Sequence, residues 1–286
     1  MLKNKTILIS GSRGVIGKQL SLLLVNEGYQ VIGTKRPGQI GIKNLTEIDI
    51  ESWKIPDTHK YEIDLIIHLA AKYSTRLDID QVKLICDSNI GLTSSVVELA
   101  SVNRIPVIAF GTFVEKYPGN NGLSYYANSR RISNGILFDY SGKFNFGLDY
   151  VYMYDSYSAD TSRGKFIDSL INQGPDDSPI NASLGYQVQD LVYIEDVLKA
   201  ISGLIKNGNR DKKNSWQIRT NSETTLRSLA ELIGEIKGFD LKIKWGNFPY
   251  GNRDVFQLWN CADNLLDLNN LIPLKTRLTD ILNKKI

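Results

Sequence analysis

The first half of the chain alternates short apolar runs with stretches whose apolar residues recur at helical spacing. Thr6–Ser10 is a β-rich apolar run that ends at a glycine, whereas Val15–Asn26 repeats its apolar residues once per helical turn. The same alternation predicts further strands at Tyr29–Thr34, Asp64–His68, Pro106–Phe110 and Phe144–Tyr150, and helices at Ile79–Val102 and Tyr126–Tyr140. Such alternation predicts right-handed β-α-β units, and hence an α/β fold with a doubly wound parallel sheet.

Beyond Tyr150 the regular alternation stops, and loops rich in tyrosine, aspartate, serine and glycine follow. The shorter elements indicated in this half are helices at Lys165–Asn172, Val197–Lys206 and Thr225–Lys237 and strands at Leu191–Ile194 and Leu241–Trp245. We therefore expect a large sheet domain over residues 1–150, which about residues 185–215 rejoin, and a smaller mixed lobe formed mainly by residues 151–286.

The composition is that of a globular protein, because 42% of the 286 residues are hydrophobic and 23% are charged. The net charge of +3, from 34 basic and 31 acidic residues, leaves little excess to attract nucleic acid or a membrane surface. The cysteines, Cys86 and Cys261, form neither a disulfide framework nor a metal-ligand spacing, so no metal is expected. Met1–Lys5 lacks the layout of a signal peptide, and a cytoplasmic protein is therefore expected.

A glycine-rich turn joins the first predicted strand to the first predicted helix. Its sequence is Gly11-Ser12-Arg13-Gly14-Val15-Ile16-Gly17. In this position glycines allow a tight turn, bring backbone amides close to a pyrophosphate and let the helix pack on the sheet. The helix N-terminus adds positive potential. The turn therefore predicts a Rossmann-type dinucleotide site, and the alternative is an ordinary strand–helix turn.

The spacing G-x-x-G-x-x-G resembles the short-chain dehydrogenase/reductase family, and the chain length and C-terminal lobe resemble its extended branch. This resemblance implies further cofactor contacts from Asp49, Ile50, Leu69, Ala70, Ala71 and Asn89. Asp49 corresponds to the acid that family members present to the adenine, whereas Asn89 can equally be a routine helix residue. His68 can be a core histidine and is given no chemical role.

The residues after the second predicted strand indicate which dinucleotide is bound. An NAD enzyme usually ends this strand with an acidic residue that holds the ribose 2′-hydroxyl. Here Lys35 and Arg36 follow Gly33-Thr34 with no carboxylate, and Arg13 lies inside the glycine turn. Guanidinium and ammonium groups suit a 2′-phosphate, so we predict NADP(H), with Arg13 and Arg36 as the main contacts and Lys35 as a helper. The alternative is that these cations are solvated.

The family combines a Ser or Thr with Tyr-x-x-x-Lys, whose spacing places the phenol and the cation on one helix face. Thr112 and Tyr126 match this pattern, but Arg130 stands where the resemblance implies lysine. Arginine keeps the charge in a bulkier planar group. Since a reduction starts from protonated tyrosine, its default state near neutral pH, we expect the arginine to favour a reductase. The alternative is that Tyr126 only packs and Arg130 is solvated.

The residues after Thr112 argue against one branch of the family. Nucleotide-sugar dehydratases carry an Asp-Glu pair at this point, and this chain has Phe113-Val114, which cannot do that acid–base work. A dehydratase is therefore not expected.

The C-terminal half resembles nucleotide-diphosphate-sugar 4-ketoreductases of the CDP-paratose and CDP-abequose synthase group. The resemblance implies substrate contacts from Lys165, Phe166, Gln189 and Arg253. Gln189 stands where the group has arginine, and Arg253 is expected to bind the diphosphate, because a planar fork can hold phosphate oxygens bidentately. Arg253 can also be a surface residue in a turn.

These resemblances imply a cytoplasmic NADPH-dependent reductase of a 4-keto-6-deoxy nucleotide-diphosphate sugar, working in O-antigen or capsule synthesis as a homodimer. Two alternatives stay open: an NAD-dependent nucleotide-sugar 4-epimerase, and a non-catalytic dinucleotide-binding sensor. No contact with nucleic acid or membrane is expected.

Overall fold

The computed structural model describes residues 5–56, 58, 61–74, 78–117, 124–208, 210–251, 254–266, 268 and 271–284. The chain forms two compact units. The first comprises Met1–Met153, Ala200–Gln217 and Cys261–Leu266, and the second comprises Tyr154–Lys199, Ile218–Asn260 and Asp267–Ile286. Within the described ranges, no helix is long and apolar enough to cross a membrane.

An eight-stranded sheet forms the centre of the first unit, in the order β13-β10-β6-β5-β4-β1-β2-β3. Its strands are β1 (Thr6–Ser10), β2 (Gln30–Lys35), β3 (Thr46–Asp49), β4 (Leu65–His68), β5 (Val107–Thr112), β6 (Leu148–Met153), β10 (Lys213–Ile218) and β13 (Asn264–Leu265). Neighbouring strands pair in parallel from β3 across to β6. The predicted parallel α/β sheet is therefore confirmed, although β3 was not among the predicted strands.

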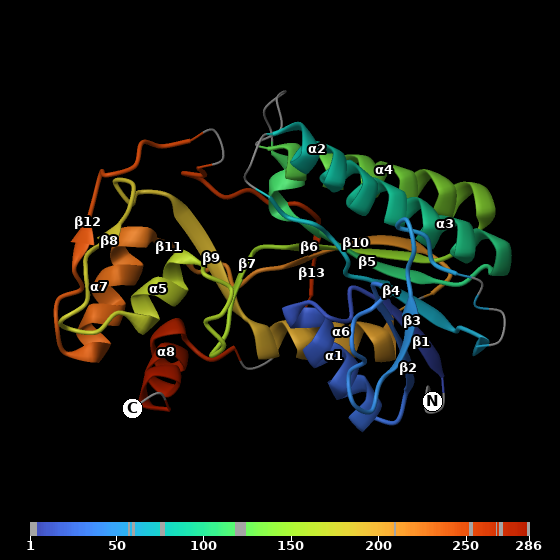
Figure 1. Ribbon diagram of the computed structural model, residues 1–286, viewed down its shortest axis with the longest axis horizontal. Coiled ribbons are helices and arrows are strands. Elements are labelled where there is room, and N and C mark those ends of the chain that lie inside the picture. The colour runs from blue at the N-terminus through green and yellow to red at the C-terminus, as the bar shows by residue number, and fades with distance from the viewer. Residues whose placement is uncertain are drawn as a thin grey trace. The chain divides into compact units, whose positions relative to one another are not determined.

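Helices cover both faces of this sheet (Figure 1). On one face lie α1 (Val15–Asn26) and α6 (Ile194–Asn207), and on the other lie α2 (Ile79–Ile85), α3 (Leu92–Asn103) and α4 (Tyr125–Phe144). The core between the layers is apolar and fully buried, as at Leu8, Ile66, Val96, Ile108 and Leu137. Burying these side chains supplies the main driving force for the layered fold.

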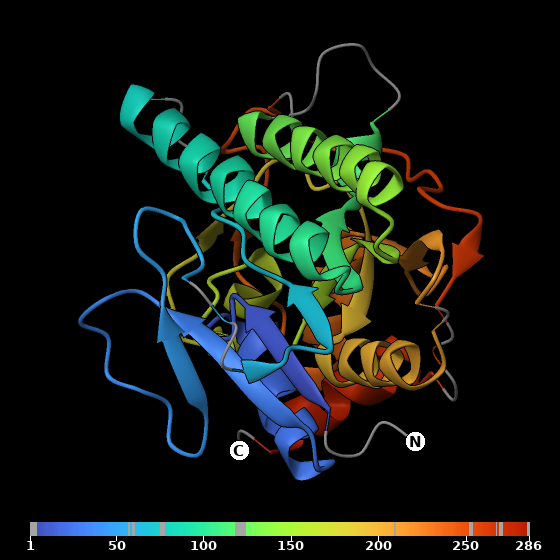
Figure 2. The ribbon, with the colours of Figure 1, turned by 90° about the vertical axis from the view of Figure 1, so that its right-hand side faces the viewer.

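The single helix predicted over Ile79–Val102 is interrupted by a π-helical turn at Cys86–Gly91. The axis nevertheless continues, and the segments run as one rod beside α4 (Figure 2). The predicted strand at Phe144–Tyr150 also starts later than expected, because α4 extends to Phe144 and ends at Asn145, which has a φ of 56°. Asparagine tolerates this left-handed conformation and so can end a helix.

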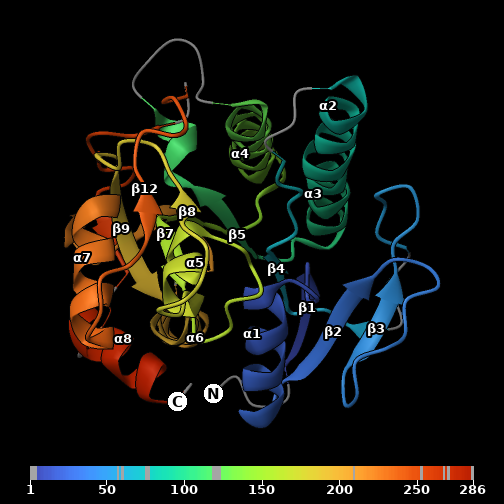
Figure 3. The ribbon, with the colours of Figure 1, turned by 60° about the vertical axis from the view of Figure 1, so that its left-hand side comes forward.

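The second unit is smaller and mixed (Figure 3). It contains a three-stranded sheet of β7 (Asp155–Tyr157), β9 (Val188–Tyr193) and β11 (Glu223–Thr225), and a two-stranded pair of β8 (Ile180–Asn181) and β12 (Ile243–Lys244). Its helices are α5 (Phe166–Asn172), α7 (Leu226–Lys237) and α8 (Leu274–Asn283). Helices and strands share a core that includes Ile167, Leu191, Leu229 and Leu278.

Candidate active site

The glycine-rich turn after β1 lies against the turn that follows β4. Gly11 has a φ of 81°, and a Cβ on it would lie 2.6 Å from the backbone nitrogen of Ala70. A Cβ on Gly17 would lie 2.1 Å from the carbonyl oxygen of Gly11, so both positions require glycine. Gly14, the N-cap of α1, has no side chain with which to cap the helix. The amides of the first turn therefore need another acceptor, and a pyrophosphate fits that need.

Ser12 joins the glycine turn to the end of β2 by two hydrogen bonds. Its buried hydroxyl donates to the carbonyl oxygen of Thr34 and accepts from the Thr34 amide, both at 3.0 Å. A Cβ on Gly33 would lie 2.6 Å from that hydroxyl, so the close approach requires glycine in β2 as well. Val15 and Ile16 are half-buried in the first turn of α1. The turn and the end of β2 are thus one fixed piece of the site.

Arg13, predicted to bind a 2′-phosphate, already has an acidic partner. Its Nη1 lies 3.0 Å from each carboxylate oxygen of Glu47, and its Nη2 donates to the carbonyl oxygen of Ile40 at 2.8 Å. The Glu47 carboxylate also accepts from the backbone amide of Ile42 at 2.7 Å. Glu47 lies in β3, which the sequence reading missed, so this pairing was not foreseen.

The other two predicted cations differ from each other. Nζ of Lys35 lies 2.5 Å from Oδ1 of Asp49, the residue predicted to face the adenine. Ile50 donates its amide to the carbonyl oxygen of Lys35 at 2.8 Å and packs against the core. The Arg36 side chain is exposed and has no hydrogen-bond or ion-pair partner within the described part of the chain.

His68 ends β4 in a buried chain of hydrogen bonds. The Thr93 hydroxyl donates to the carbonyl oxygen of Asn89 at 2.6 Å, so it accepts from Nε2 of His68 at 2.9 Å. Nδ1 of His68 then accepts from the Ser10 hydroxyl at 2.6 Å. Burial, and to a smaller extent the charge of Arg130, lower the pKa of His68 to about 3. The imidazole is therefore a neutral core group.

Asn89 joins the turn after β4 to helix α4. It is fully buried in the π-helical turn, where its Oδ1 accepts from the amide of Lys72 at 2.7 Å. Its Nδ2 donates to the carbonyl oxygen of Lys72 at 3.1 Å and to the hydroxyl of Ser129 at 2.9 Å. Leu69, Ala70 and Ala71 lead from β4 into this turn. The amide thus holds together the segments that carry predicted cofactor contacts and Tyr126.

The three predicted catalytic residues lie in one region of the first unit. Thr112 ends β5, and Tyr126 and Arg130 lie one turn apart on α4. The partly buried ring of Tyr126 packs edge-on against Tyr73, with the ring centroids 5.1 Å apart. Arg130 is only 1% exposed, which excludes the alternative of a solvated side chain, and its Nη2 donates to the carbonyl oxygen of Phe110.

Two nitrogen atoms of Arg130 are buried and have no acceptor in the part of the chain that the structure describes. Its Nε and Nη1 have no hydrogen-bond partner among the residues that the structure describes. Buried polar groups are normally paired, and leaving one unpaired costs free energy. The hydroxyl groups of a bound ribose are acceptors of the right kind, so this region fits a dinucleotide.

The ionisation of the pair suits a neutral phenol beside a cation. Burial raises the pKa of Tyr126, and the positive charge of Arg130 opposes that shift. Burial alone lowers the pKa of Arg130, but Tyr150, Glu115 and Tyr126 together raise it above its usual value. Near neutral pH, Tyr126 therefore keeps its proton and Arg130 keeps its charge.

Glu115 is a buried part of this site that the sequence reading did not single out. Its carboxylate accepts from the amide of Thr112 at 2.5 Å and from the hydroxyl of Tyr150 at 2.9 Å. The Thr112 side chain accepts in turn from the Glu115 amide, which completes a capping box on the 3₁₀ helix Phe113–Lys116. Burial raises the pKa of Glu115, and Arg130 lowers it. The capping-box spacing Thr-x-x-Glu is the signal that identifies Glu115 from sequence.

Three of the predicted substrate residues lie in the second unit. Lys165 is the N-cap of α5, and its Nζ donates to the carbonyl oxygen of Ser156 at 3.0 Å. The ring of Phe166 packs near Trp245, and Gln189 in β9 pairs with Thr224 in β11. Arg253 lies outside the described residues. The roles of all four in binding substrate stay predictions.

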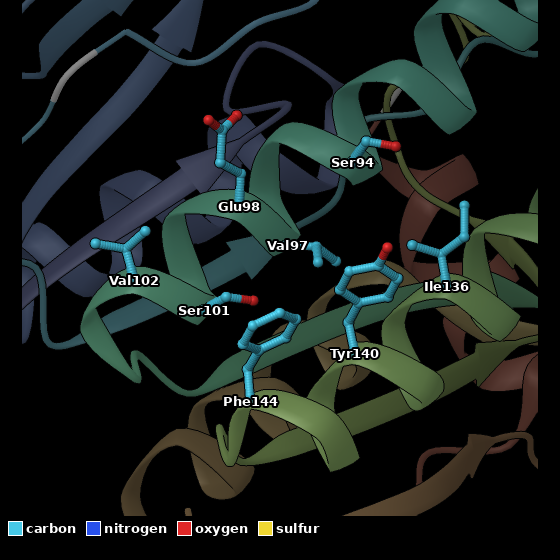
Figure 4. Close-up of a pocket in the computed structure, with 8 residues that line it drawn as sticks. All are labelled: Ser94, Val97, Glu98, Ser101, Val102, Ile136, Tyr140 and Phe144. Carbon is cyan, nitrogen blue, oxygen red and sulfur yellow. The ribbon is translucent and has the colours of Figure 1, made fainter.

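A hollow of about 440 Å³ opens between α3 and α4 in the first unit (Figure 4). Its lining is largely apolar and comes from Ser94, Val97, Glu98, Ser101, Val102, Ile136, Tyr140 and Phe144. None of these residues belongs to the predicted cofactor or catalytic sets. The hollow is therefore a separate feature of this face.

Comparisons with known proteins show the family and agree with the fold. Residues 7–218 match the NAD dependent epimerase/dehydratase family. The chain is 27% identical to CDP-abequose synthase from Yersinia pseudotuberculosis, over 85% of this chain and 88% of that protein. It is 26% identical to CDP-abequose synthase from Salmonella muenchen, over 89% of this chain and 88% of that protein.

A crystal structure of UDP-glucuronic acid 4-epimerase from Bacillus cereus, with UDP-glucuronic acid and NAD, has a TM-score of 0.80 at 19% identity. The match covers 98% of this chain and 100% of that chain. An NAD-dependent NDP-hexosamine 5,6-dehydratase also has a TM-score of 0.80, at 16% identity, over 98% of this chain and 97% of that chain. These structures agree with the fold described above. Because the family match spans most of its length, this chain belongs to the NAD dependent epimerase/dehydratase family.

Proposed function

We propose that the chain is an NADP(H)-dependent oxidoreductase that reduces the keto group of a 4-keto-6-deoxy nucleotide-diphosphate sugar. The observation that carries this proposal is the buried Arg130 beside Tyr126, with two nitrogen atoms free of acceptors among the described residues. The two relatives named CDP-abequose synthase support a nucleotide-linked sugar as the substrate class. The reaction then belongs to the cytoplasmic synthesis of a surface polysaccharide, such as O-antigen or capsule.

In this reaction Tyr126 donates its phenolic proton to the keto oxygen. Its raised pKa keeps the phenol protonated at neutral pH, which is the state that a reduction needs at its start. The oxygen of Thr112 accepts from the Glu115 amide, so the hydroxyl proton of Thr112 is available to the same keto oxygen. Arg130 stabilises the negative charge that develops on Tyr126. The bound dinucleotide supplies the hydride.

The preference for NADP(H) is supported by the cations beside the glycine turn. Arg36 is exposed after β2 without a partner in the described ranges, so it can bind a 2′-phosphate directly. Arg13 is held beside it on the fixed turn, and Lys35 ends β2. On the substrate side, Lys165 and Phe166 contact the nucleotide, Gln189 takes the place of an arginine, and Arg253 binds the diphosphate.

A second candidate is an NAD-dependent nucleotide-sugar 4-epimerase. The carboxylates on Arg13 and Lys35 favour it, because Glu47 and Asp49 partly neutralise the cations that would attract a 2′-phosphate. The similar solved structure of a 4-epimerase with NAD favours it as well. The two candidates differ in whether reductant must be added.

The test is NADPH consumption by the purified protein with 4-keto-6-deoxy sugars linked to CDP, GDP, dTDP or UDP. We expect one of them to be reduced only when NADPH is added. The Tyr126→Phe variant should lose about 10²–10⁴-fold in kcat, because general acid catalysis contributes that much. Tyr125→Phe, an exposed neighbour on the same helix, is the matched control and should keep its activity. NAD retained through purification, with interconversion of 4-hydroxy sugars and no added reductant, would instead establish the epimerase.

We also infer that the chain pairs with a second copy through the α3–α4 face. Val102 is 70% exposed, and Tyr140 and Phe144 are 42% and 38% exposed, at the hollow between these helices. Tyr140 and Phe144 stack on each other with their ring centroids 5.6 Å apart. A contiguous apolar face of this kind is typical of a protein–protein interface.

A further inference from the structure

Strand β3 presents two carboxylates to the cations predicted to bind a 2′-phosphate. Glu47 and Asp49 are separated by one residue, so their side chains point to the same face of the strand. Glu47 pairs with Arg13, and Asp49 pairs with Lys35. The sequence predicted Asp49 here, but it did not predict that both carboxylates of this strand pair with the cations.

We propose that Glu47 determines the cofactor preference of this chain by competing with a 2′-phosphate for Arg13. The proposal deepens the function proposed above and rests on its dinucleotide site. Two contacts of 3.0 Å join Nη1 of Arg13 to the Glu47 carboxylate. A phosphate that binds Arg13 must therefore either share the guanidinium with the Glu47 carboxylate or displace that carboxylate from it.

Burial distinguishes Glu47 from Asp49. The Glu47 side chain is 2% exposed, whereas that of Asp49 is 47% exposed. Water and salt screen an exposed carboxylate far more than a buried one. The charge of Glu47 is therefore screened less than that of Asp49, and it has the larger effect on Arg13 and on an incoming dianion.

The remaining contacts allow Arg13 to bind two partners at once. A guanidinium has five N–H donors, and Glu47 and Ile40 engage Nη1 and Nη2. Glu47 thus holds Arg13 at the end of the glycine turn but also offsets its charge. The expected consequence is weak discrimination between the two dinucleotides, with NADP held less tightly than the cations alone would allow.

Glu47 also supplies the acid that β2 lacks. It stands opposite Gly33 in the register of β2 and β3, so it reaches the same edge of the sheet from the neighbouring strand. An NAD enzyme usually places this acid on the second strand itself. Here the acid comes from the third strand and acts through an arginine.

The test compares adenosine 2′,5′-bisphosphate with adenosine 5′-monophosphate, because the pair isolates the 2′-phosphate without any turnover. Calorimetric titration of Glu47→Gln should show about tenfold tighter binding of the bisphosphate, since the competing charge is gone and the side-chain shape is kept. The monophosphate should change by less than about twofold. Glu51→Gln, an exposed glutamate beyond the same strand, is the matched control for the loss of one negative charge and should bind as the wild type does.

A double-mutant cycle shows whether the effect passes through Arg13. Arg13→Met should weaken bisphosphate binding, and Glu47→Gln should add nothing in that background. Thermal unfolding of each ligand-free variant reports whether it has folded. If Arg13→Met weakens the bisphosphate but Glu47→Gln does not strengthen it, the competition is overturned while the NADP site stands. If Arg13→Met leaves bisphosphate binding unchanged, the proposed 2′-phosphate contact itself is wrong, and the role of Glu47 falls with it.

Discussion

Arginine in place of the family's lysine changes the polar core beneath Tyr126. The planar group of Arg130 reaches the carbonyl oxygen of Phe110 with one nitrogen and leaves two others free of described acceptors. A lysine carries its three donors on a single nitrogen, so it cannot present separate nitrogens in different directions as the guanidinium does. The buried charge is also surrounded by Glu115 and Tyr150, which raise the pKa of Arg130. Arg130 is therefore a buried, charged member of the polar core of the site.

Replacing Arg130 by lysine should lower kcat/KM for reduction by about tenfold, because the charge is kept but its fork is lost. Steady-state kinetics with NADPH and the keto sugar measures this change. Arg131→Lys, whose Nε donates to the carbonyl oxygen of Glu115 at 2.8 Å, makes the same substitution one residue further along α4 and should change reduction less. A large gain in reduction by Arg130→Lys would contradict the idea that arginine suits a reductase.

The neutral imidazole of His68 makes stability depend on pH in a known direction. Its pKa is about 3 in the folded chain and 6.5 when unperturbed, so only the unfolded state gains a proton between these values. Stability from this group is complete above pH 6.5 and is lost as the pH falls toward 3. From pH 7 to pH 4.5 the loss is about 3 kcal/mol.

Denaturant unfolding at the two pH values, with wild type and His68→Gln, tests this linkage. The glutamine variant cannot gain the proton, so its free energy of unfolding should fall less over the same interval. The difference between the two proteins should therefore shrink by about 3 kcal/mol at the lower pH. An unchanged difference would show that His68 is protonated in the folded chain.

At the scale of elements, the π-helical turn determines where Asn89 points. The turn lies between α2 and α3, and the side-chain amide of Asn89 within it donates to the carbonyl oxygen of Lys72 and to the hydroxyl of Ser129. π-Helical turns are rare and are found frequently at functional sites. Ser129 precedes Arg130 on α4, so the bridge fixes the helix turn that carries the predicted catalytic residues.

Asn89→Ala should cost about 2 kcal/mol of stability and about tenfold in kcat, because buried partners lose their hydrogen bonds and Tyr126 loses its support. The KM for the sugar should change little, since the amide contacts other parts of this chain. Asn103→Ala, near the exposed end of α3 with one weak contact of 3.5 Å, is the control and should be neutral. Equal losses from both variants would argue against a positioning role for Asn89.

The elements that the sequence predicted correctly are those encoded by local pattern. β1, the glycine turn and α1 follow from adjacent residues, and Gly11 and Gly17 are required by contacts within or next to that turn. β3 is only four residues long and is followed by little apolar periodicity, so it was missed. The expected continuous helix was wrong at the π-helical turn, where Asn89 bonds to the distant residues Lys72 and Ser129, and no local pattern indicates these contacts.

The residues of the candidate site likewise fall into two groups, those predicted from local sequence and those recognised only from contacts in the fold. Thr112, Tyr126 and Arg130 were predicted from local sequence, as the end of a strand and a Tyr-x-x-x-Arg spacing. The structure has Thr112 at the end of β5 and the other two one turn apart on α4, and their catalytic roles stay predictions. Glu47 was not predicted, because what makes it important is a contact with Arg13 far along the chain. Glu115 was overlooked although its capping-box spacing with Thr112 is local, and its contact with Tyr150 appears only in the fold. Pair contacts of this kind are visible only once the fold has brought the strands together.

At the scale of the whole molecule, the α3–α4 face connects the proposed dimer to the site. α4 begins with Tyr125 and Tyr126 and ends with Phe144, so one helix carries both the predicted catalytic pair and the exposed aromatic face. Lys143 lies over the rings of Tyr140 and Phe144, with its Nζ 5.9 and 5.6 Å from their centroids. Pairing through this face would therefore stiffen the helix that presents Tyr126.

Tyr140→Glu should convert the dimer to a monomer, because it would bury a carboxylate without a partner in an apolar contact, and the loss of its hydration costs free energy. Size-exclusion chromatography with light scattering measures the mass directly. Leu22→Glu is the matched control, because Leu22 is 37% exposed on α1, which covers the opposite face of the sheet. Affinity for the dinucleotide should be unchanged in both variants, since neither residue belongs to the predicted cofactor set. A wild-type monomer, or a Tyr140→Glu protein that stays dimeric, would exclude this face as the interface. If Tyr140→Glu is monomeric, its kcat per chain compared with that of the wild-type dimer shows whether pairing of α4 supports catalysis.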